Sequence, residues 1–445
     1  MADVIFQPLK LRTLTLKNRI LRSGISGCWD NEDGSGTDTR INWETKFARG
    51  GVGAIISSCA AVTMHGRMFA NQATVHADDF IPFWARLGRA VHAHDCKYVM
   101  QLGHSGRQQY MPGLSNELRL PLSSTGRSEP LHGIPCRAMT LAEIKETIRA
   151  FADGAWRARE AGLDGVEVHA ADGCLIHQFL SSAVNDRRDE YGGGLENRAR
   201  FLLDIIDAIR HKVGWDFHLQ VKISAVDHSN LVPWEGRGNT LEDGIQVCKW
   251  VEARGADALH VSIGSMFPHP LNPPGDFAFD TAVRNYDAML SSGLRTFRNY
   301  LVFRYRPLRP LFSWIWDRMK RGRPIEGVSA EAARATKAAV SIPVISTGGY
   351  QTASFIRGLL QEGYFDAVSI ARALLANPGL PRDWGAGQDL PDRPCTYCNK
   401  CLLNVIKHPL GCYELIRFSS YEAMVDEIHS VYPTPASAAF EHTRT

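Results

Sequence analysis

Four cysteines near the carboxyl end have the residue type and spacing of metal ligands. They are Cys395, Cys398, Cys401 and Cys412 in CTYCNKCLLNVIKHPLGC, with the spacing C-x2-C-x2-C-x10-C. Four thiolates at such spacing can enclose an iron–sulfur cluster or a zinc ion, and unligated thiols are the third alternative. The other six cysteines are scattered along the chain, so the sequence does not indicate a disulfide framework.

A second group of chemically capable residues follows the apolar stretch DGVEVH. His169, Asp172 and Cys174 stand in HAADGC at the point where that stretch ends. A histidine can donate or accept a proton near neutral pH, and a thiol with an ordinary pKa of about 8.5 can donate one. The dipeptide Asp172–Gly173 also suits a tight turn, and Cys174 could be a small buried filler. We therefore expect an acid–base site here, with a structural alternative for two members.

A third group suits a phosphate. Gly348 and Gly349 follow the apolar run IPVIST, and Arg372 follows DAVSIA. Glycines allow backbone N–H groups to approach a phosphate closely, and arginine adds a charged, forked donor. The alternatives are a simple chain turn and a surface ion pair. Lys222 lies inside the apolar run VKIS, where a buried cation is costly unless it is paired, so we expect it to be functional.

The elements that must position these residues alternate along the chain. Helical patterns separate eight short apolar runs, at 20–26, 52–60, 97–102, 164–169, 218–224, 257–262, 342–347 and 366–371. The clearest helix is FLLDIIDAIRHKVG, which has an apolar stripe and Gly214 as its stop. Eight strands alternating with helices predict an α/β fold of the closed (β/α)8 TIM-barrel type.

The chain is longer than a minimal barrel of about 250 residues. The surplus lies in the segments 103–139, 170–195 and 263–328, which follow the third, fourth and sixth strands. These loops are expected on the face where barrel enzymes build their active sites. We predict a barrel over 1–385, with a basic aromatic insert at about 280–328. A second segment, 386–445, carries the cysteines and one helix, in SSYEAMVDEIHSVY.

Several stretches together resemble the Old Yellow Enzyme family of NADH:flavin oxidoreductases, in the branch that includes 2,4-dienoyl-CoA reductase. The longest is AGLDGVEVHAADGCLIHQFLSSAVNDRRDEYGGGLENRARF at 161–201. The others are FQPLKLRTLTLKNRI, QLGHSGRQ, VKISAVD, VISTGGY and VSIAR. They span nearly the whole predicted barrel. The resemblance implies a barrel that binds flavin mononucleotide (FMN) and receives electrons from NADH or NADPH.

The resemblance also implies a role for each residue of the flavin site. Along the isoalloxazine it places Ser23, Gly24, Ile25, Ser26 and Cys59, with the Ser26 hydroxyl able to donate towards flavin O4. Gln101 would bind the pyrimidine side, and Lys222 would balance the negative charge that reduced flavin carries near N1. Many relatives have arginine there, and lysine keeps the charge but loses the fork. The phosphate would be held by Gly348, Gly349, Ala371 and Arg372. For Gln101 and Ser26, packing at the barrel rim is the alternative.

In this family a histidine binds the substrate carbonyl with a second histidine or asparagine three residues on, and a tyrosine two residues later supplies a proton. Here the set is His169, Asp172 and Cys174, so two of the three positions differ. An ionised aspartate only accepts hydrogen bonds and would repel an enolate-like oxygen. Asp172 could instead orient His169, stabilise its imidazolium or contact a donor group on the substrate. The proton donor is left unassigned.

These residues predict an oxidoreductase that passes hydride from flavin N5 to the C=C bond of an α,β-unsaturated carbonyl compound or an enoyl or dienoyl thioester. The related branch carries a 4Fe-4S cluster after its barrel, with slightly longer cysteine spacing. A cluster here would need an external electron-transfer partner. The alternatives are a flavin dehydrogenase of amine or alicyclic substrates that sends electrons out through the cluster, and a flavin electron-transfer subunit.

Basic charge is concentrated in one segment. Residues 295–323 hold nine bases and one acid, a net charge of +8, while the whole chain carries +3. Phe, Tyr and Trp are interleaved with these bases. The segment could contact an anionic membrane surface, dock a CoA-like phosphate, cover the active site as a lid or pack on a second copy in a homo-oligomer. Nucleic acid is not expected as a partner, because no fold signal supports it.

The remaining composition is ordinary for a globular enzyme, with 44% hydrophobic and 22% charged residues. The amino-terminal stretch MADVIFQPLKLRT lacks the features of a signal peptide, and no apolar run approaches the roughly 18 residues that span a bilayer. We therefore expect a cytoplasmic enzyme, with surface association to a membrane as an addition.

Overall fold

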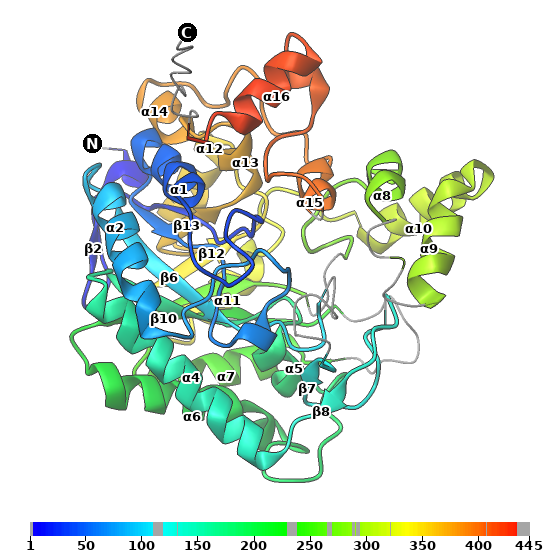
Figure 1. The fold of residues 1–445 in the computed structure, drawn as a ribbon. Helices are drawn as coiled ribbons and strands as arrows, with labels where there is room; N and C mark the ends of the chain where they lie inside the picture. Colours follow the sequence, from blue (N-terminus) through cyan, green and yellow to red (C-terminus); the bar gives the residue numbers. More distant parts are fainter. Residues whose placement is uncertain are drawn as a thin grey trace, which may run out of the picture.

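The computed structural model describes residues 3–109, 119–130, 132–228, 238–264, 269–286, 290, 294–320, 322–405 and 407–433. Within them, eight parallel strands form a closed barrel (Figure 1). In chain order the strands are β3 (Ile20–Arg22), β4 (Ala54–Ile56), β6 (Lys97–Gly103), β9 (Gly165–Ala170), β10 (His218–Ser224), β11 (Ala258–Ser262), β12 (Val344–Thr347) and β13 (Ala367–Ile370). Pairing of β13 with β3 and of β4 with β6 closes the ring. The predicted (β/α)8 fold is confirmed.

Helices follow each strand and cover the outside of the barrel, as Figure 1 shows. They are α1 (Asp38–Gly50), α2 (Ile81–His92), α4 (Leu141–Glu160), α6 (Leu195–Val213), α7 (Leu241–Ala253), α11 (Ala330–Lys337), α12 (Ala353–Gln361), α13 (Arg372–Ala376) and α14 (Leu380–Gly385). The stripe predicted for α6 is buried from Leu202 to Val213, and Gly214 ends the helix with a positive φ of 76°. Capping boxes begin α4, at Thr140 and Glu143, and α7, at Thr240 and Asp243.

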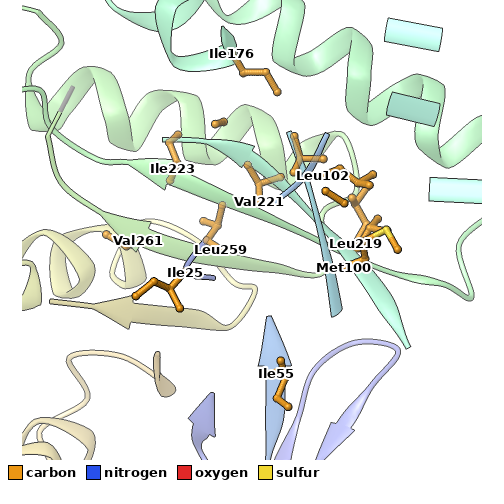
Figure 2. Close-up of a cluster of buried hydrophobic side chains, with 14 of the residues drawn as sticks. Ile25, Ile55, Met100, Leu102, Ile176, Leu219, Val221, Ile223, Leu259 and Val261 are labelled. Atoms are coloured by element: carbon orange, nitrogen blue, oxygen red, sulfur yellow. The ribbon is translucent and has the colours of Figure 1, made fainter. Parts of the chain in front are cut away.

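The barrel core is apolar because its strands are buried on both faces. Figure 2 shows side chains of β6, β10 and β11, among them Leu102, Val221 and Val261, gathered with Ile25 and Ile176. A short hairpin of β1 (Leu9–Lys10) and β2 (Thr15–Leu16) contributes leucines to a second cluster, with Leu21, Ile56 and Val99. The cavity described below therefore lies above a filled barrel.

Two predicted strands are shorter than expected. The run 20–26 forms a strand only at Ile20–Arg22. The run 52–60 forms β4 at Ala54–Ile56 and, at its end, the first residue of the short strand β5 (Ala60–Ala61), which pairs with β6. Gly24 packs so closely on Ser57 O and the Gln101 amide that an added Cβ would clash, and the chain leaves the sheet here. As a result Ser23 to Ser26 run along the mouth of the barrel instead of continuing a strand.

The surplus loops hold additional elements after the strands predicted to carry them. They are β7 (Leu122–Ser123), β8 (Arg137–Ala138), α5 (Leu175–Leu180), α8 (Phe279–Tyr286), α9 (Leu294–Arg304) and α10 (Arg309–Lys320). The segment after the barrel forms α15 (Lys400–Asn404) and α16 (Tyr421–His429), the helix predicted from its sequence. Short 3-10 turns complete the fold at Val4–Phe6, Met64–Gly66, Asp78–Phe80, Arg306–Leu308 and Leu415–Arg417.

Among the described helices, none combines the length and apolar character needed to cross a bilayer.

Candidate active site

A cavity of about 230 Å³ opens where the strands of the barrel end. Its lining comes from the residues that follow or end the barrel strands, as expected for a barrel enzyme. Every residue proposed from the sequence as catalytic or flavin-binding lines it: Ser23, Gly24, Ile25, Ser26, Cys59, Gln101, His169, Asp172, Cys174, Lys222, Gly348, Gly349, Ala371 and Arg372. The structure thus brings the whole set together around one space.

An ion pair dominates one wall of this cavity. Lys222 Nζ lies 2.6 Å from Asp172 Oδ2. Asp172 also accepts hydrogen bonds from Ser262 Oγ at 3.2 Å and Asn272 Nδ2 at 3.0 Å. Burial disfavours both charges, but their attraction outweighs it, so the pKa of Asp172 lies well below its usual range and that of Lys222 is raised. Both groups are therefore charged at neutral pH.

The chain conformation at Asp172 belongs to a turn as well as to the site. Asp172 and Gly173 both have positive φ, at 58° and 79°, and the Asp172 N–H donates to Ser224 Oγ at 3.2 Å. Aspartate tolerates this left-handed region better than most residues. The turn alternative and the site role are thus compatible, because the turn directs the carboxylate to Lys222. Within the described residues the structure gives no hydrogen bond between Asp172 and His169.

His169 is held neutral at the end of β9. Burial and the positive charge of Lys222 lower its pKa to about 4, although Asp172 acts in the opposite direction. Its Nδ1 atom is buried and has no hydrogen-bond partner in the described part of the chain. A neutral imidazole carries one N–H, so His169 can donate one hydrogen bond into the cavity without transferring a proton.

The two cavity cysteines are weak acids. Burial raises the pKa of Cys59 to about 12, and it raises the pKa of Cys174 well above its ordinary value. Both groups are thiols at neutral pH. Cys174 directly precedes α5 and is almost fully buried. These features make it a poor proton donor and favour a packing role.

A buried polar network lies beneath the cavity and was not predicted. Glu167 accepts hydrogen bonds from Gln101 Nε2 at 2.7 Å and Gln220 Nε2 at 2.5 Å, and it pairs with His260 Nδ1 at 2.8 Å. Burial works against its charge, but His260 and Gln101 lower its pKa to about 2. The network fixes the Gln101 amide against the cavity. Its sequence signal is the period of two, which puts Glu167 on the same strand face as His169.

The glycine pair and Arg372 form the other end of the cavity. An added Cβ would collide with Ser329 Oγ at Gly348 and with Ile325 O at Gly349, and Gly349 has φ 72°. Only glycine fits this close approach of two chain segments. Arg372 donates through Nη1 to Pro274 O at 2.6 Å and to Asn399 Oδ1 at 2.5 Å. This cradle of small residues beside a buried guanidinium fits a phosphate.

A cap segment, 269–275, covers the cavity and was not predicted as part of the site. Leu271, Asn272, Pro273 and Pro274 line the space. Asn272 binds Asp172 and Pro274 O binds Arg372, so the segment joins the two polar ends of the cavity. Its sequence, HPLNPPG, shows prolines but no pattern that indicates these contacts.

The four predicted cysteine ligands line a second, smaller cavity of about 20 Å³. Burial raises the pKa of Cys395, Cys398 and Cys401, and each of the other three cysteines would oppose a charge on Cys401. In the described residues no three His, Cys, Asp or Glu side chains form a group that could hold one metal ion. The four cysteines therefore line a small cavity, and no three of them are grouped closely enough to bind one metal ion.

Arg372 lines both cavities and joins them physically. Its guanidinium lies over the ring of Tyr397, 5.2 Å from the centroid, and the Tyr397 hydroxyl donates to Gly349 O at 2.5 Å. Tyr397 stands between the first two cysteines, and Asn399 follows the second. The cysteine segment thus packs directly against the predicted phosphate end, and Tyr397, Leu402 and Val405 also line the larger cavity.

A closed parallel barrel with this glycine–arginine end, a buried lysine and a neutral histidine at its mouth has the features of a flavin mononucleotide oxidoreductase. The chain belongs to the NADH:flavin oxidoreductase / NADH oxidase family, whose model matches residues 4–292. This is the family that the sequence predicted.

Similar proteins agree with this assignment. The chain is 32% identical to an NADH oxidase of Thermoanaerobacter brockii over 428 residues, which is 93% of this chain and 58% of that protein. It is 38% identical to an NADPH dehydrogenase of Geobacillus sp. over 272 residues, 60% of this chain and 75% of that one. The structure of 2-naphthoyl-CoA reductase in complex with 2-naphthoyl-CoA shares the fold with a TM-score of 0.75 and 24% identity, over 93% of this chain and 57% of that chain. The chain thus spans little more than half the length of two of these proteins.

Proposed function

We propose that the chain reduces the C=C bond of an α,β-unsaturated carbonyl compound, or of an enoyl or dienoyl thioester, with FMN as cofactor and NADH or NADPH as electron donor. FMN held in this cavity would supply the hydride chemistry that couples the nicotinamide to the alkene. The observation that carries the proposal is the single cavity that joins a neutral His169, the Lys222–Asp172 pair and the Gly348–Gly349–Arg372 end.

The residues of the cavity have distinct tasks under this proposal. His169 donates a hydrogen bond to the substrate carbonyl and thereby polarises the conjugated double bond. Lys222 supplies positive charge beside the flavin pyrimidine, and Gln101, held by Glu167, binds the same side. Gly348, Gly349, Ala371 and Arg372 hold the phosphate, while Ser23 to Ser26 and Cys59 line the ring system. The thioester class is suggested by the shared fold of 2-naphthoyl-CoA reductase.

Asp172 gives specific support to a second candidate function. Its carboxylate is ionised, lines the cavity and retains 18% exposure of its side chain. An ionised carboxylate accepts hydrogen bonds and attracts cations, so it suits an ammonium or another donor group better than an enolate oxygen. The second candidate is therefore a flavin dehydrogenase of amine or alicyclic substrates.

We further propose that residues 386–445 form a functional unit in which Cys395, Cys398, Cys401 and Cys412 hold a 4Fe-4S cluster. The support is their spacing in the sequence and their place in the lining of one small cavity, which shares Arg372 with the flavin cavity. A cluster would provide a one-electron exit or entry next to the flavin for an external partner protein. The short contact chain from Gly349 through Tyr397 to the cysteine segment is where the two centres would meet.

Anaerobic spectroscopy tests these proposals with one preparation. The protein purified without oxygen should show flavin absorbance, and NADH or NADPH should bleach it. If neither nicotinamide bleaches the flavin but an amine does, the second candidate replaces the first. If a protein donor alone changes the spectrum, the chain is an electron-transfer subunit. A folded protein that is colourless and does not take up added FMN would contradict all three.

A further inference from the structure

The insert formed by α8, α9 and α10 has an apolar surface on each of two sides. Towards the molecule, Phe277, Phe303, Phe312 and Trp316 pack together, with ring centroids 4.8 to 6.0 Å apart. Trp316 Nε1 donates to Gly275 O at 2.9 Å and ties the insert to the cap segment. This inner cluster fixes the position of the helices, so the composition of the outer side needs a separate explanation.

The outer side carries an apolar stripe that nothing in the described structure covers. The stripe consists of Leu294, Phe297, Leu301, Tyr305, Leu308, Leu311, Trp314 and Ile315, with exposures from 40% to 87%. Leu294, Phe297 and Leu301 are three or four residues apart along α9, which places them on one face of that helix. Leu311 has the same spacing to Trp314 and Ile315 along α10. Contiguous exposed apolar side chains of this size mark an interaction surface.

Positive charge borders the same stripe. The exposed bases are Arg298, Arg304, Arg306, Arg318 and Arg323. The nearby acids Asp280 and Asp317 are in salt bridges with Arg309 and Lys320, and in the described insert only these two bases form salt bridges. Arg318 lies over the Trp314 ring, 5.4 Å from its centroid. The five exposed arginines are thus available to a negatively charged partner.

We propose that the outer face of α9 and α10 docks the protein on an anionic lipid surface. Leucine, phenylalanine and tryptophan would enter the boundary between headgroups and acyl chains, and the arginines would reach the lipid phosphates. A second copy of the chain fits this surface less well. In a twofold dimer the same patch meets itself, which would bring the exposed arginines of both copies together. Figure 1 shows α9 and α10 at one side of the molecule, beyond the barrel helices.

Vesicle binding of the full chain tests this proposal. We expect the protein to sediment with vesicles of phosphatidylcholine and phosphatidylglycerol at 3:1, but not with phosphatidylcholine alone, and to be released by high salt. The triple variant Arg304→Gln, Arg306→Gln, Arg318→Gln should lower partitioning on the order of 100-fold. The double variant Phe297→Ser, Trp314→Ser should also stay in the supernatant.

A matched control replaces exposed apolar side chains elsewhere, in the double variant Leu390→Ser, Tyr421→Ser, which should bind vesicles like the native chain. Circular dichroism checks that each variant is folded. Brominated phosphatidylglycerol should quench the tryptophan fluorescence of the native protein more than that of the Trp314→Phe variant. The proposal would be overturned if the native chain does not sediment with the vesicles at low salt. It would also be overturned if the stripe variant, which is the double variant Phe297→Ser, Trp314→Ser, binds the vesicles as well as the native chain does. Light scattering that shows a native dimer, converted to monomer by the stripe variant, in the absence of vesicle binding would overturn it as well.

Discussion

Lys222 and Asp172 form a buried ion pair at the mouth of the barrel, with 2.6 Å between Nζ and Oδ2. The pair joins two residues that the sequence assigned to separate tasks, one beside the flavin and one beside the substrate. Its existence means that the charge facing a flavin is partly balanced before any cofactor is reduced. The consequences can be measured in variants of Asp172.

Replacing Asp172 with alanine should destabilise the protein, because it leaves the Lys222 ammonium buried without its carboxylate. The expected loss in the free energy of unfolding is about 3 kcal/mol, measured by urea denaturation. Asp172→Asn should lose less, since the amide oxygen still accepts a hydrogen bond. Under the proposed alkene reduction, Asp172→Asn retains NAD(P)H-dependent turnover, whereas under the amine alternative it loses oxidation of amines. Equal stability of Asp172→Ala and the native chain would contradict the pair's role.

The free energy of unfolding should depend on pH through the titration of His169. Its pKa is lowered from 6.5 to about 4 on folding, so the unfolded chain binds the additional proton first. The stability associated with His169 is therefore complete above pH 6.5 and is lost as the pH falls towards 4. In His169→Gln the slope of unfolding free energy against pH should decrease between these values. An unchanged slope would show that His169 is not the buried neutral group described here.

The activity of His169 variants should follow from the same neutrality. Because a neutral imidazole donates a hydrogen bond and keeps its proton, alkene reduction should not depend on His169 titration between pH 6.5 and 8. His169→Ala should reduce kcat by on the order of 100-fold, by analogy with loss of a preorganised donor. Nicotinamide-driven bleaching of the flavin, measured separately by stopped flow, reports whether the cofactor is still bound and reducible. Normal turnover in His169→Ala would remove it from the carbonyl site.

Glu167→Gln should weaken the polar network that lies beneath the cavity. The substitution removes the charged acceptor of Gln101 and Gln220, and each such hydrogen bond contributes about 1.5 to 3 kcal/mol. We expect a lower free energy of unfolding and weaker retention of FMN, measured by release of flavin on dilution. Glu362→Gln, on an exposed residue, is the matched control and should change neither. Retention of FMN equal to the native chain would mean that Gln101 does not need this partner.

The cysteine proposal predicts iron and acid-labile sulfide in protein purified without oxygen. Cys401→Ser should lose them, because Cys401 lies within electrostatic reach of the other three cysteines. Cys248→Ser, which removes a buried thiol outside both cavities, should retain them. Metal analysis and the visible spectrum decide the outcome. One zinc per chain, or no metal in either protein, would contradict a cluster.

The barrel could be predicted because the sequence pattern of each strand and helix lies within a short stretch of the chain. Each of the eight apolar runs is short, bounded by loops and followed by a helical pattern, so strand number and order follow from the chain itself. The residues at strand ends were predictable for the same reason, as Arg372 after DAVSIA and His169 at the end of DGVEVH show. The local pattern overestimated strand length at 20–26, where Gly24 leaves the sheet because of a tertiary contact. It also missed that 52–60 is divided between β4 and β5.

The partners of these residues could not be predicted, because they come from distant parts of the chain. Asp172 pairs with Lys222 across 50 positions, and Asn272 reaches Asp172 across 100. The Glu167 network had a signal in the alternation of polar residues along the strands, but its four members lie in four different runs. The cap segment had none, since its contacts depend on how a long loop folds back over the barrel.

The position of Tyr397, Leu402 and Val405 in the wall of the larger cavity affects the order of events during synthesis. A ribosome completes all eight strands by residue 370, when this wall has not yet been translated. A nascent barrel would therefore present an unfinished, open-sided cavity until residues 397–405 emerge and fold onto it. Stable capture of a nucleotide cofactor is thus expected only after residues 397–405 have folded onto the closed barrel.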